Sequence, residues 1–146
     1  MRVSPGSTGR MLRGADSFVP KVALFHCRWC LPESDAVKNL LPEHFESAVS
    51  TIKINCTARM EGELAIKAFG QGFDGVLVIG CEDGECHYES GNRQAFNRLG
   101  MLRRMLEFAG IYPERIGTIW VSPYDPASIK AQIGEYIENL NGVGPF

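Results

Sequence analysis

Five cysteines are the residues of this sequence best suited to chemistry, and they follow short apolar runs. They are Cys27, Cys30, Cys56, Cys81 and Cys86. The apolar runs that precede them are residues 22–25, 52–54 and 75–79. Ligands of α/β folds gather at the carboxyl ends of parallel strands. If these runs are strands of one such sheet, three strands deliver thiols to the same edge.

Four thiolates are enough to hold either zinc or an iron–sulfur cluster, so one of the five cysteines is spare or has another role. The Cys27-Arg28-Trp29-Cys30 segment also has the spacing of a thioredoxin-type redox pair, but this interpretation leaves three cysteines unexplained. A free cysteine is often only a small core residue. Zinc ribbons usually pair two CxxC knuckles on hairpins, whereas these thiols come from three crossover loops. A metal centre therefore accounts for the pattern best.

Several neighbours of the thiols are suited to setting the properties of such a site, such as its hydrogen bonding and its redox potential. His26 and His87 each adjoin a cysteine, and we interpret them as hydrogen-bond donors around the site or as surface residues rather than ligands. Trp29 and Tyr88 are expected to keep water out, which tunes the potential of a redox centre. Three acidic residues would lower that potential, or only solvate their loop; they are Glu82, Asp83 and Glu85.

Length and composition favour one small domain. The chain has 146 residues, is 45% hydrophobic and carries a formal net charge of −2, which does not point to nucleic acid or a membrane surface. No apolar run approaches the roughly 20 residues of a membrane-spanning helix, and the N-terminus lacks the apolar segment of a secretory signal. We therefore expect a cytoplasmic protein, in which cysteines at such spacings more often bind metals or catalyse reactions than form disulfides.

Hydrophobic periodicity predicts strands and helices in strict alternation. The predicted strands are residues 21–25, 51–55, 75–79 and 118–122, and the predicted helices are residues 33–41, 61–69, 92–109 and a last one that begins at Asp125-Pro126. This alternation implies a parallel sheet with right-handed crossovers and helices on both faces. We predict an α/β fold with a flavodoxin-like four-stranded parallel sheet in the order 2-1-3-4. That order would bring the thiol-bearing ends of the first three strands together.

Apolar residues at three- and four-residue steps mark the expected buried faces of the helices. They are Leu64, Ala65, Ala68 and Phe69 in the second helix, Ala95, Leu99, Leu102, Met105, Leu106 and Ala109 in the third, and Ile129, Ile133, Ile137 and Leu140 in the last. The predicted boundaries are a flexible N-terminal arm of residues 1–20, a domain of residues 21–140 and a loose C-terminal tail of residues 141–146. The arm is rich in Ser, Gly and Pro, carries Arg2, Arg10 and Arg13 against the single acid Asp16, and is a candidate for binding a neighbour.

Two nucleotide-binding motifs are excluded. Residues 70–75 match the letters GxGxxG, but they follow a predicted helix and precede a predicted strand, which is the reverse of the dinucleotide-binding context. The sequence also lacks GxxxxGK[ST], so it has no P-loop.

The thiol loop resembles the hallmark of the methyl-viologen-reducing hydrogenase delta-subunit family. The segments GVLVIGC (75–81), GECHY (84–88) and GN (91–92) are similar to the family pattern DGVLVxGCxxGdCHYxxGN. Cys27-Arg28-Trp29-Cys30 resembles the CxWC motif of the family, and Cys56 with Arg59 resembles its CsGR motif. The chain departs from the family at Thr57-Ala58, where a Ser-Gly pair is usual. The resemblance covers about residues 21–140.

The resemblance implies an electron-transfer subunit with a 2Fe–2S cluster and no catalytic site of its own. In the family, this subunit links a hydrogenase- or formate-dehydrogenase-type oxidoreductase to a flavin-containing heterodisulfide reductase A-type subunit. We rank Cys27, Cys56, Cys81 and Cys86 as the ligands, and we place Cys30 last because it lies further along its predicted loop. The alternative function is a cysteine-based thiol redox enzyme or a zinc-stabilised interaction module.

Overall fold

The computed structural model describes residues 18–29, 39–41, 43–82, 86, 90–121 and 126–146. The strands are β1 (Val22–Cys27), β2 (Val49–Ile54), β3 (Gly75–Cys81) and β4 (Ile116–Val121). The helices are α3 (Gly62–Gly70), α4 (Gly91–Phe108) and α5 (Pro126–Val143), with short 3-10 turns η1 (Glu43–Ala48), η2 (Thr57–Arg59) and η3 (Pro113–Arg115). No helix among the described residues is long and apolar enough to cross a membrane.

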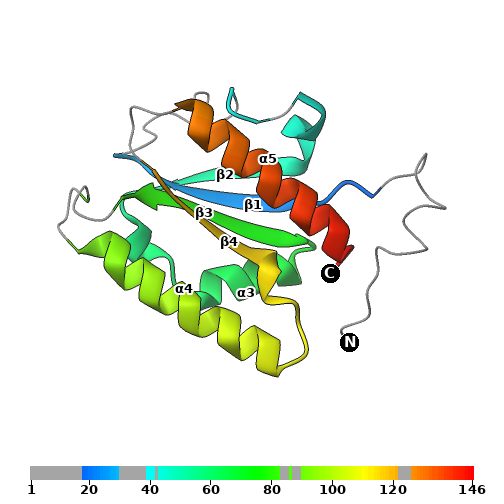
Figure 1. The fold of residues 1–146 in the computed structure, drawn as a ribbon. Coiled ribbons are helices and arrows are strands. Elements are labelled where there is room, and N and C mark those ends of the chain that lie inside the picture. The colour runs from blue at the N-terminus through cyan, green and yellow to red at the C-terminus, as the bar shows by residue number, and fades with distance from the viewer. Residues whose placement is uncertain (1–17, 30–38, 42, 83–85, 87–89, 122–125) are drawn as a thin grey trace.

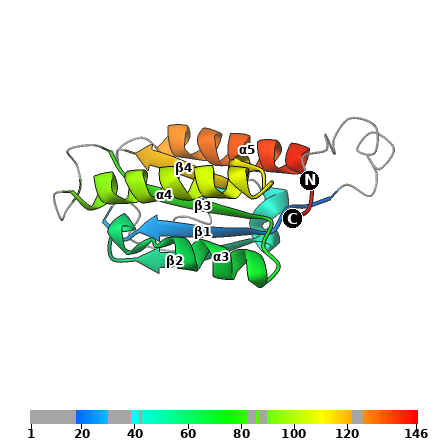
Figure 2. The ribbon, with the colours of Figure 1, turned by 90° about the horizontal axis from the view of Figure 1, so that it is seen from below.

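The four strands form one parallel sheet in the order β2-β1-β3-β4, which confirms the predicted α/β flavodoxin-like arrangement. Figure 2 shows the strands in this order with their arrowheads at the same end. Val22 of β1 is in register with Val49 of β2 and with Gly75 of β3. Because β1 lies between β2 and β3, the carboxyl ends of these three strands adjoin one another (Figure 1).

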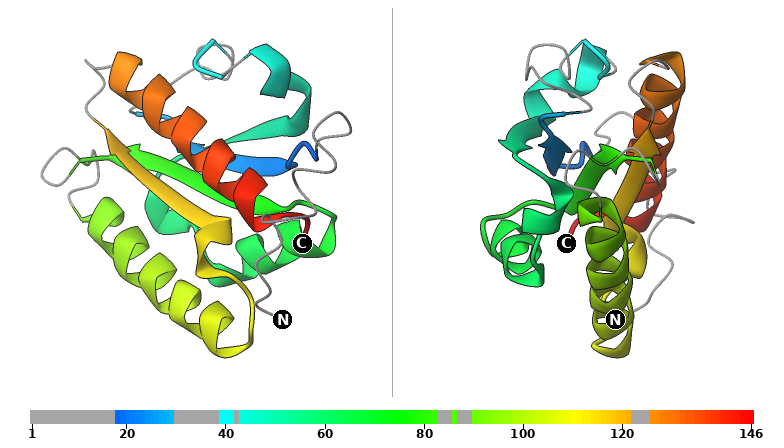
Figure 3. Two further views of the ribbon diagram at one scale, coloured as in Figure 1. Left: turned by 45° about the vertical axis from the view of Figure 1, so that its right-hand side comes forward. Right: turned by 90° about the vertical axis from the view of Figure 1, so that its left-hand side faces the viewer.

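Two core layers hold the sheet between its helices. On one face, α5 packs on the sheet through Ile129, Ile133, Ile137 and Leu140, each no more than 1% exposed, as predicted. On the other face, α3 and α4 pack on Ala23, Phe25, Val76 and Val78. Figure 3 shows α5 on the opposite side of the sheet from α3 and α4. β1 and β3 are buried along their whole length, which explains their continuous apolar runs.

The predicted buried stripe of α4 is confirmed at Ala95, Leu99, Leu102 and Leu106. It is wrong at Met105, whose side chain is 62% exposed, and at the exposed Ala109, which caps the helix end. Successive residues turn about 100° around a helix, so Met105 lies well to one side of Leu106. The spacing of apolar residues in the sequence did not distinguish the buried positions of α4 from the exposed position of Met105.

Several predicted boundaries differ from the structure. β2 begins at Val49, and the preceding predicted connection contains the 3-10 turn η1. β4 begins at Ile116, two residues earlier than predicted. Most of the predicted helix at residues 33–41 lies outside the described residues, and residues 39–41 form a turn and a bend instead of a helical end.

The C-terminal tail packs against the rest of the domain, which corrects the prediction that it is loose. α5 continues to Val143, and the ring of Phe146 stacks on Phe69 with centroids 4.8 Å apart. The Phe146 N–H donates to Asp74 Oδ1 at 2.9 Å. The buried guanidinium of Arg115 donates to the carbonyl oxygens of residues 144 and 145 at 3.1 and 2.8 Å. These buried donors need acceptors, and the tail supplies them.

Replacing Phe146 with alanine is therefore expected to lower the free energy of unfolding by about 1 kcal/mol, because it removes the stack on Phe69 and a contact with the Arg115 guanidinium 5.1 Å from the ring. Phe108→Ala is the matched control, since this ring is 96% exposed. Its effect should stay within about 0.5 kcal/mol. Urea unfolding followed by circular dichroism measures both. Equal stabilities of the two variants would show that the Phe146 ring contributes nothing.

Candidate metal centre

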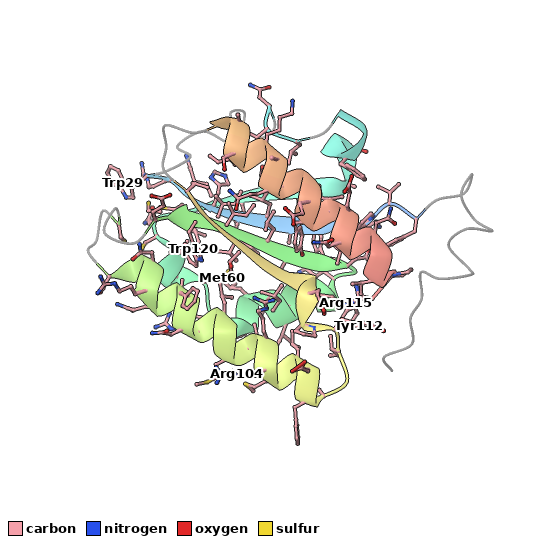
Figure 4. All side chains as sticks on the ribbon, in the orientation of Figure 1. Trp29, Met60, Arg104, Tyr112, Arg115 and Trp120 are labelled. Atoms are coloured by element: carbon pink, nitrogen blue, oxygen red, sulfur yellow. The ribbon has the colours of Figure 1, made fainter. Side chains whose placement is uncertain are left out.

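The structure brings four of the five cysteines to one edge of the sheet, as the order of the strands predicted. Cys27 and Cys81 are the last residues of β1 and β3. Cys56 caps η2 just after β2, and Cys86 lies between β3 and α4. Cys30 lies outside the described residues, so its place in the ranking stays a prediction. Trp29 and Trp120 mark this end of the sheet in Figure 4.

The four thiols form two pairs. The sulfur of Cys27 lies 3.9 Å from that of Cys81, and the sulfur of Cys56 lies 3.8 Å from that of Cys86. Neither pair is a disulfide, which would need sulfurs about 2 Å apart. Two thiolates bound at about 2.3 Å to one tetrahedral metal lie about 3.8 Å apart. Each pair therefore has the spacing of two ligands on a single metal ion.

The two pairs remain separate groups. Among the described residues, no set of three or more His, Cys, Asp and Glu side chains is placed to hold one ion. A mononuclear zinc site needs four ligands around one point. A 2Fe–2S cluster takes two ligands on each of its two irons. The donor set of two thiol pairs matches this ligand requirement.

Backbone N–H groups face one sulfur of each pair. The N–H of Trp29 donates to Cys27 Sγ at 3.4 Å, and the N–H of Ala58 donates to Cys56 Sγ at 3.5 Å. The second bond arises because Cys56 is the N-cap of η2, where a side chain accepts from the first turn. Such donors stabilise negative charge on sulfur and are among the factors that set the potential of a thiolate-held cluster.

Gly91, the first residue of α4, allows the thiols to approach the helix. A Cβ at this position would lie 2.1 Å from Cys56 Sγ and 3.3 Å from Cys86 Sγ. The first turn of α4 thus begins directly at this pair. The positive end of the helix dipole is therefore close to the two sulfurs of this pair. In the sequence, Gly91 stood out only as part of the family pattern. The short contact with Cys56 Sγ shows why a glycine is needed at this position.

Asn92 fixes the end of β3 where the thiol loop begins. Its side chain is 4% exposed. Its Nδ2 donates to the carbonyl oxygens of Cys81 and Glu82 at 3.0 and 2.6 Å, and its Oδ1 accepts from the N–H of Arg93 at 2.9 Å. The side chain therefore joins the start of α4 to the end of β3. Sequence reasoning did not assign Asn92 this role.

Burial controls the protonation of the Cys56 thiol. Cys27, Cys56 and Cys81 are buried, and Cys86 is partly exposed. Burial raises the pKa of the Cys56 thiol, the Ala58 N–H lowers it in part, and the nearby Cys86 and Cys27 raise it further. Without a metal, the protonated thiol is therefore favoured at Cys56. A metal that binds there must displace a proton, so binding is linked to pH.

The residues predicted to surround the thiols differ in how far they are buried. His26 is fully buried in β1, which rules out the surface alternative for it. Trp29 is 45% exposed beside the guanidinium of Arg28, so its indole borders solvent. Glu82 is exposed. The other predicted neighbours, His87, Tyr88, Asp83 and Glu85, lie outside the described residues.

A hollow of about 660 Å³ opens beside the thiol of Cys81. Its walls include Phe96 of α4 and Trp120 of β4, whose ring centroids are 6.3 Å apart. Trp120 Nε1 is buried and has no hydrogen-bond partner among the described residues. The hollow gives one thiol pair an aromatic border.

Curated relatives of this chain include two kinds of protein. One is the iron-sulfur subunit of the F420-non-reducing hydrogenase of Archaeoglobus profundus, which is 30% identical over 90% of this chain and 96% of its own length. The vhc iron-sulfur subunit of the F420-non-reducing hydrogenase of Methanococcus voltae is also 30% identical, over 90% and 91% of the two chains. The match therefore covers nearly the whole of these relatives.

The second kind is much longer. The A-type chain of the ferredoxin:CoB-CoM heterodisulfide reductase of Methanosarcina mazei is 32% identical over 87% of this chain, but the match is only 16% of that protein. A domain of this kind is thus one part of a larger reductase chain there. The family model described as methyl-viologen-reducing hydrogenase, delta subunit, matches residues 22–144. The chain belongs to the methyl-viologen-reducing hydrogenase delta-subunit family.

Proposed function

We propose that this chain is an electron-transfer subunit that holds one 2Fe–2S cluster between its two thiol pairs. The observation that carries the proposal is the pairing itself, with sulfurs 3.9 and 3.8 Å apart. In this assignment Cys27 and Cys81 hold one iron, and Cys56 and Cys86 hold the other. The cluster would accept and release one electron at a time. Relatives named as iron-sulfur subunits support an iron–sulfur cofactor.

The chain's own residues would hold and tune this group. Main-chain N–H groups of Trp29 and Ala58 would donate to a sulfur of each pair. Gly91 would leave room for the thiols at the first turn of α4, and Asn92 would fix the carbonyl groups at the end of β3. Burial of Cys27, Cys56 and Cys81 would exclude water from most of the site.

The subunit would relay electrons in the cytoplasm between two larger enzymes. We propose a hydrogenase- or formate-dehydrogenase-type oxidoreductase as the donor and a flavin-containing heterodisulfide reductase A-type subunit as the acceptor. The names of the relatives support a hydrogenase and a reductase A-type chain as partners. The fusion in Methanosarcina mazei supports the second partner most directly, since there the two parts share one chain.

Iron analysis tests the cofactor. Protein purified without oxygen is expected to be brown, to contain about two irons and two sulfides per chain, and to bleach on addition of dithionite. Colourless protein with stoichiometric zinc would contradict the proposal and support the zinc-stabilised module instead. In the complete complex, electron flow between the two enzymes is expected to stop when the cluster is absent. Unchanged flow without a cluster would refute the relay.

A further inference from the structure

Exposed apolar side chains are concentrated on α4. Eight large hydrophobic side chains of the described residues are exposed, and four of them lie on this helix of 18 residues. They are Phe96, Met101, Met105 and Phe108. Single exposed apolar residues are ordinary on a protein surface, but several on one element mark an interaction site.

Three of these residues form one line. Met101, Met105 and Phe108 are spaced four and three residues apart, so they share one flank of α4. Next to this line, a groove of about 560 Å³ lies between α3 and α4 and is lined by Ile66, Met101, Leu102 and Met105. We call the three residues of the line, with Ile66, the α3–α4 ridge. Phe96 is excluded because it borders Trp120 on the other flank.

The side chains of the ridge have the composition of a protein interface. Methionine, phenylalanine and arginine are enriched at the buried centres of interfaces. Methionine also adapts its shape to irregular partners. Met101 is 65% exposed and Ile66 is 56% exposed, although both are apolar. Nothing in the described part of the chain covers them.

Charge along α4, on one side of the ridge, favours an acidic partner segment there. α4 carries four arginines and a single glutamate, whereas the whole chain has a net charge of −2. Arg98 lines the groove, and Arg104 lies on the side of α4 that faces away from the sheet (Figure 4). The α3 side of the groove carries Glu61 and an ion pair of 3.4 Å between Lys67 and Glu63, so the excess of positive charge lies along α4. The α4 side of the rim is therefore basic.

We propose that the α3–α4 ridge docks on the heterodisulfide reductase A-type chain, through a segment of that chain with apolar side chains at its centre and acidic side chains at its rim. This inference rests on the proposed function. The occupant is chosen because a domain of this kind is a fixed part of the reductase A-type chain in Methanosarcina mazei. An amphipathic helix in a groove is a common form of such recognition.

The ridge lies away from the thiols, so its role would be to bind the partner and not to hold the cofactor. Gly91, where α4 meets the thiols, is ten residues before Met101, which corresponds to about 15 Å along the helix. Because the ridge side chains are exposed, their substitution should leave the core and the thiol pairs intact. Docking can therefore be separated experimentally from cofactor binding.

Two sets of variants test the ridge in the full chain loaded with its cofactor, with purified reductase A-type chain as the probe. The double variant Met101→Ser/Met105→Ser removes apolar surface. Arg104→Glu reverses a rim charge, and Lys130→Glu makes the same change at an exposed position of α5, on the opposite face of the sheet. Calorimetry measures the dissociation constant, and the visible spectrum and melting temperature serve as checks of the cluster and the fold.

We expect the double serine variant and Arg104→Glu to weaken binding by about tenfold or more, with unchanged spectrum and melting temperature. Lys130→Glu should bind like the wild type. If the wild type binds and both ridge variants bind equally well, the ridge inference is wrong while the proposed function stands. The same variants are also tested with a purified hydrogenase subunit. If they lose binding to that subunit and keep binding to the reductase chain, the assigned occupant is wrong. A wild-type chain that does not bind the reductase chain would overturn both the proposed partner and the inference.

Discussion

Replacing Cys81 with serine is expected to abolish the visible spectrum of the cofactor. Cys81 ends a strand that is buried along its length, and its sulfur lies 3.9 Å from that of Cys27. A serine oxygen would leave one metal of the cluster without its second thiolate. Partners that only orient metal ligands already contribute about 10- to 100-fold to metal affinity, so the loss of a ligand should exceed that range. Iron per chain and visible absorbance measure the effect.

The same change at Cys30 serves as the control. We expect Cys30→Ser to keep the spectrum, while serine at Cys27, Cys56 or Cys86 should remove or distort it. An intact spectrum in Cys81→Ser, or loss of the spectrum only in Cys30→Ser, would overturn the ranking of the ligands. Thiol counting on the unfolded chain confirms that each variant lacks one thiol.

Replacing Gly91 with alanine is expected to damage the site without removing any ligand. The added methyl group would lie 2.1 Å from Cys56 Sγ, whereas ordinary contacts of such an atom are 3.4–4 Å. Cys56 or the start of α4 must therefore move by more than an ångström. Overpacking of this kind costs about 1–3 kcal/mol of stability and would separate Cys56 from Cys86. Iron content should fall well below that of the wild type.

Gly100→Ala is the matched control because it lies in the same helix and has no atom within 4 Å of the added methyl group. Alanine inside a helix is more favourable than glycine by about 0.5–1 kcal/mol, so this variant should be slightly stabilised and fully loaded with iron. Melting temperature of the metal-free protein and iron per chain are measured for both. Full iron content in Gly91→Ala would show that the close contact does not constrain the thiols.

The sequence predicted the sheet and its functional edge because both depend on local patterns. Buried strands appear as apolar runs, and a parallel sheet places the residues after each strand at one edge. Cys27, Cys56 and Cys81 were therefore located without a structure. The division of the thiols into pairs was not predictable in this way, because it depends on how neighbouring strands are aligned and on the path of the loop that carries Cys86.

The incorrect predictions came from interactions between distant parts of the chain. Periodicity assigned Met105 to the core, but packing of α3 beside α4 decides which flank is covered. The tail was predicted to be loose because its sequence has no period. The buried guanidinium of Arg115 and the carboxylate of Asp74 fix it instead, and neither contact leaves a local signal in the sequence.

The spacing of the paired cysteines along the chain also has a consequence for unfolding. Cys27 and Cys81 are 54 residues apart, and Cys56 and Cys86 are 30 residues apart, so the two intervals overlap. A group bound across both pairs would act as a cross-link that closes two interlocked loops. In the chain-entropy model, each closure of this size restricts the unfolded chain by roughly 4 kcal/mol. The cofactor would therefore also cross-link the domain, and its loss would free the two connections that run from β1 to β2 and from β2 to β3.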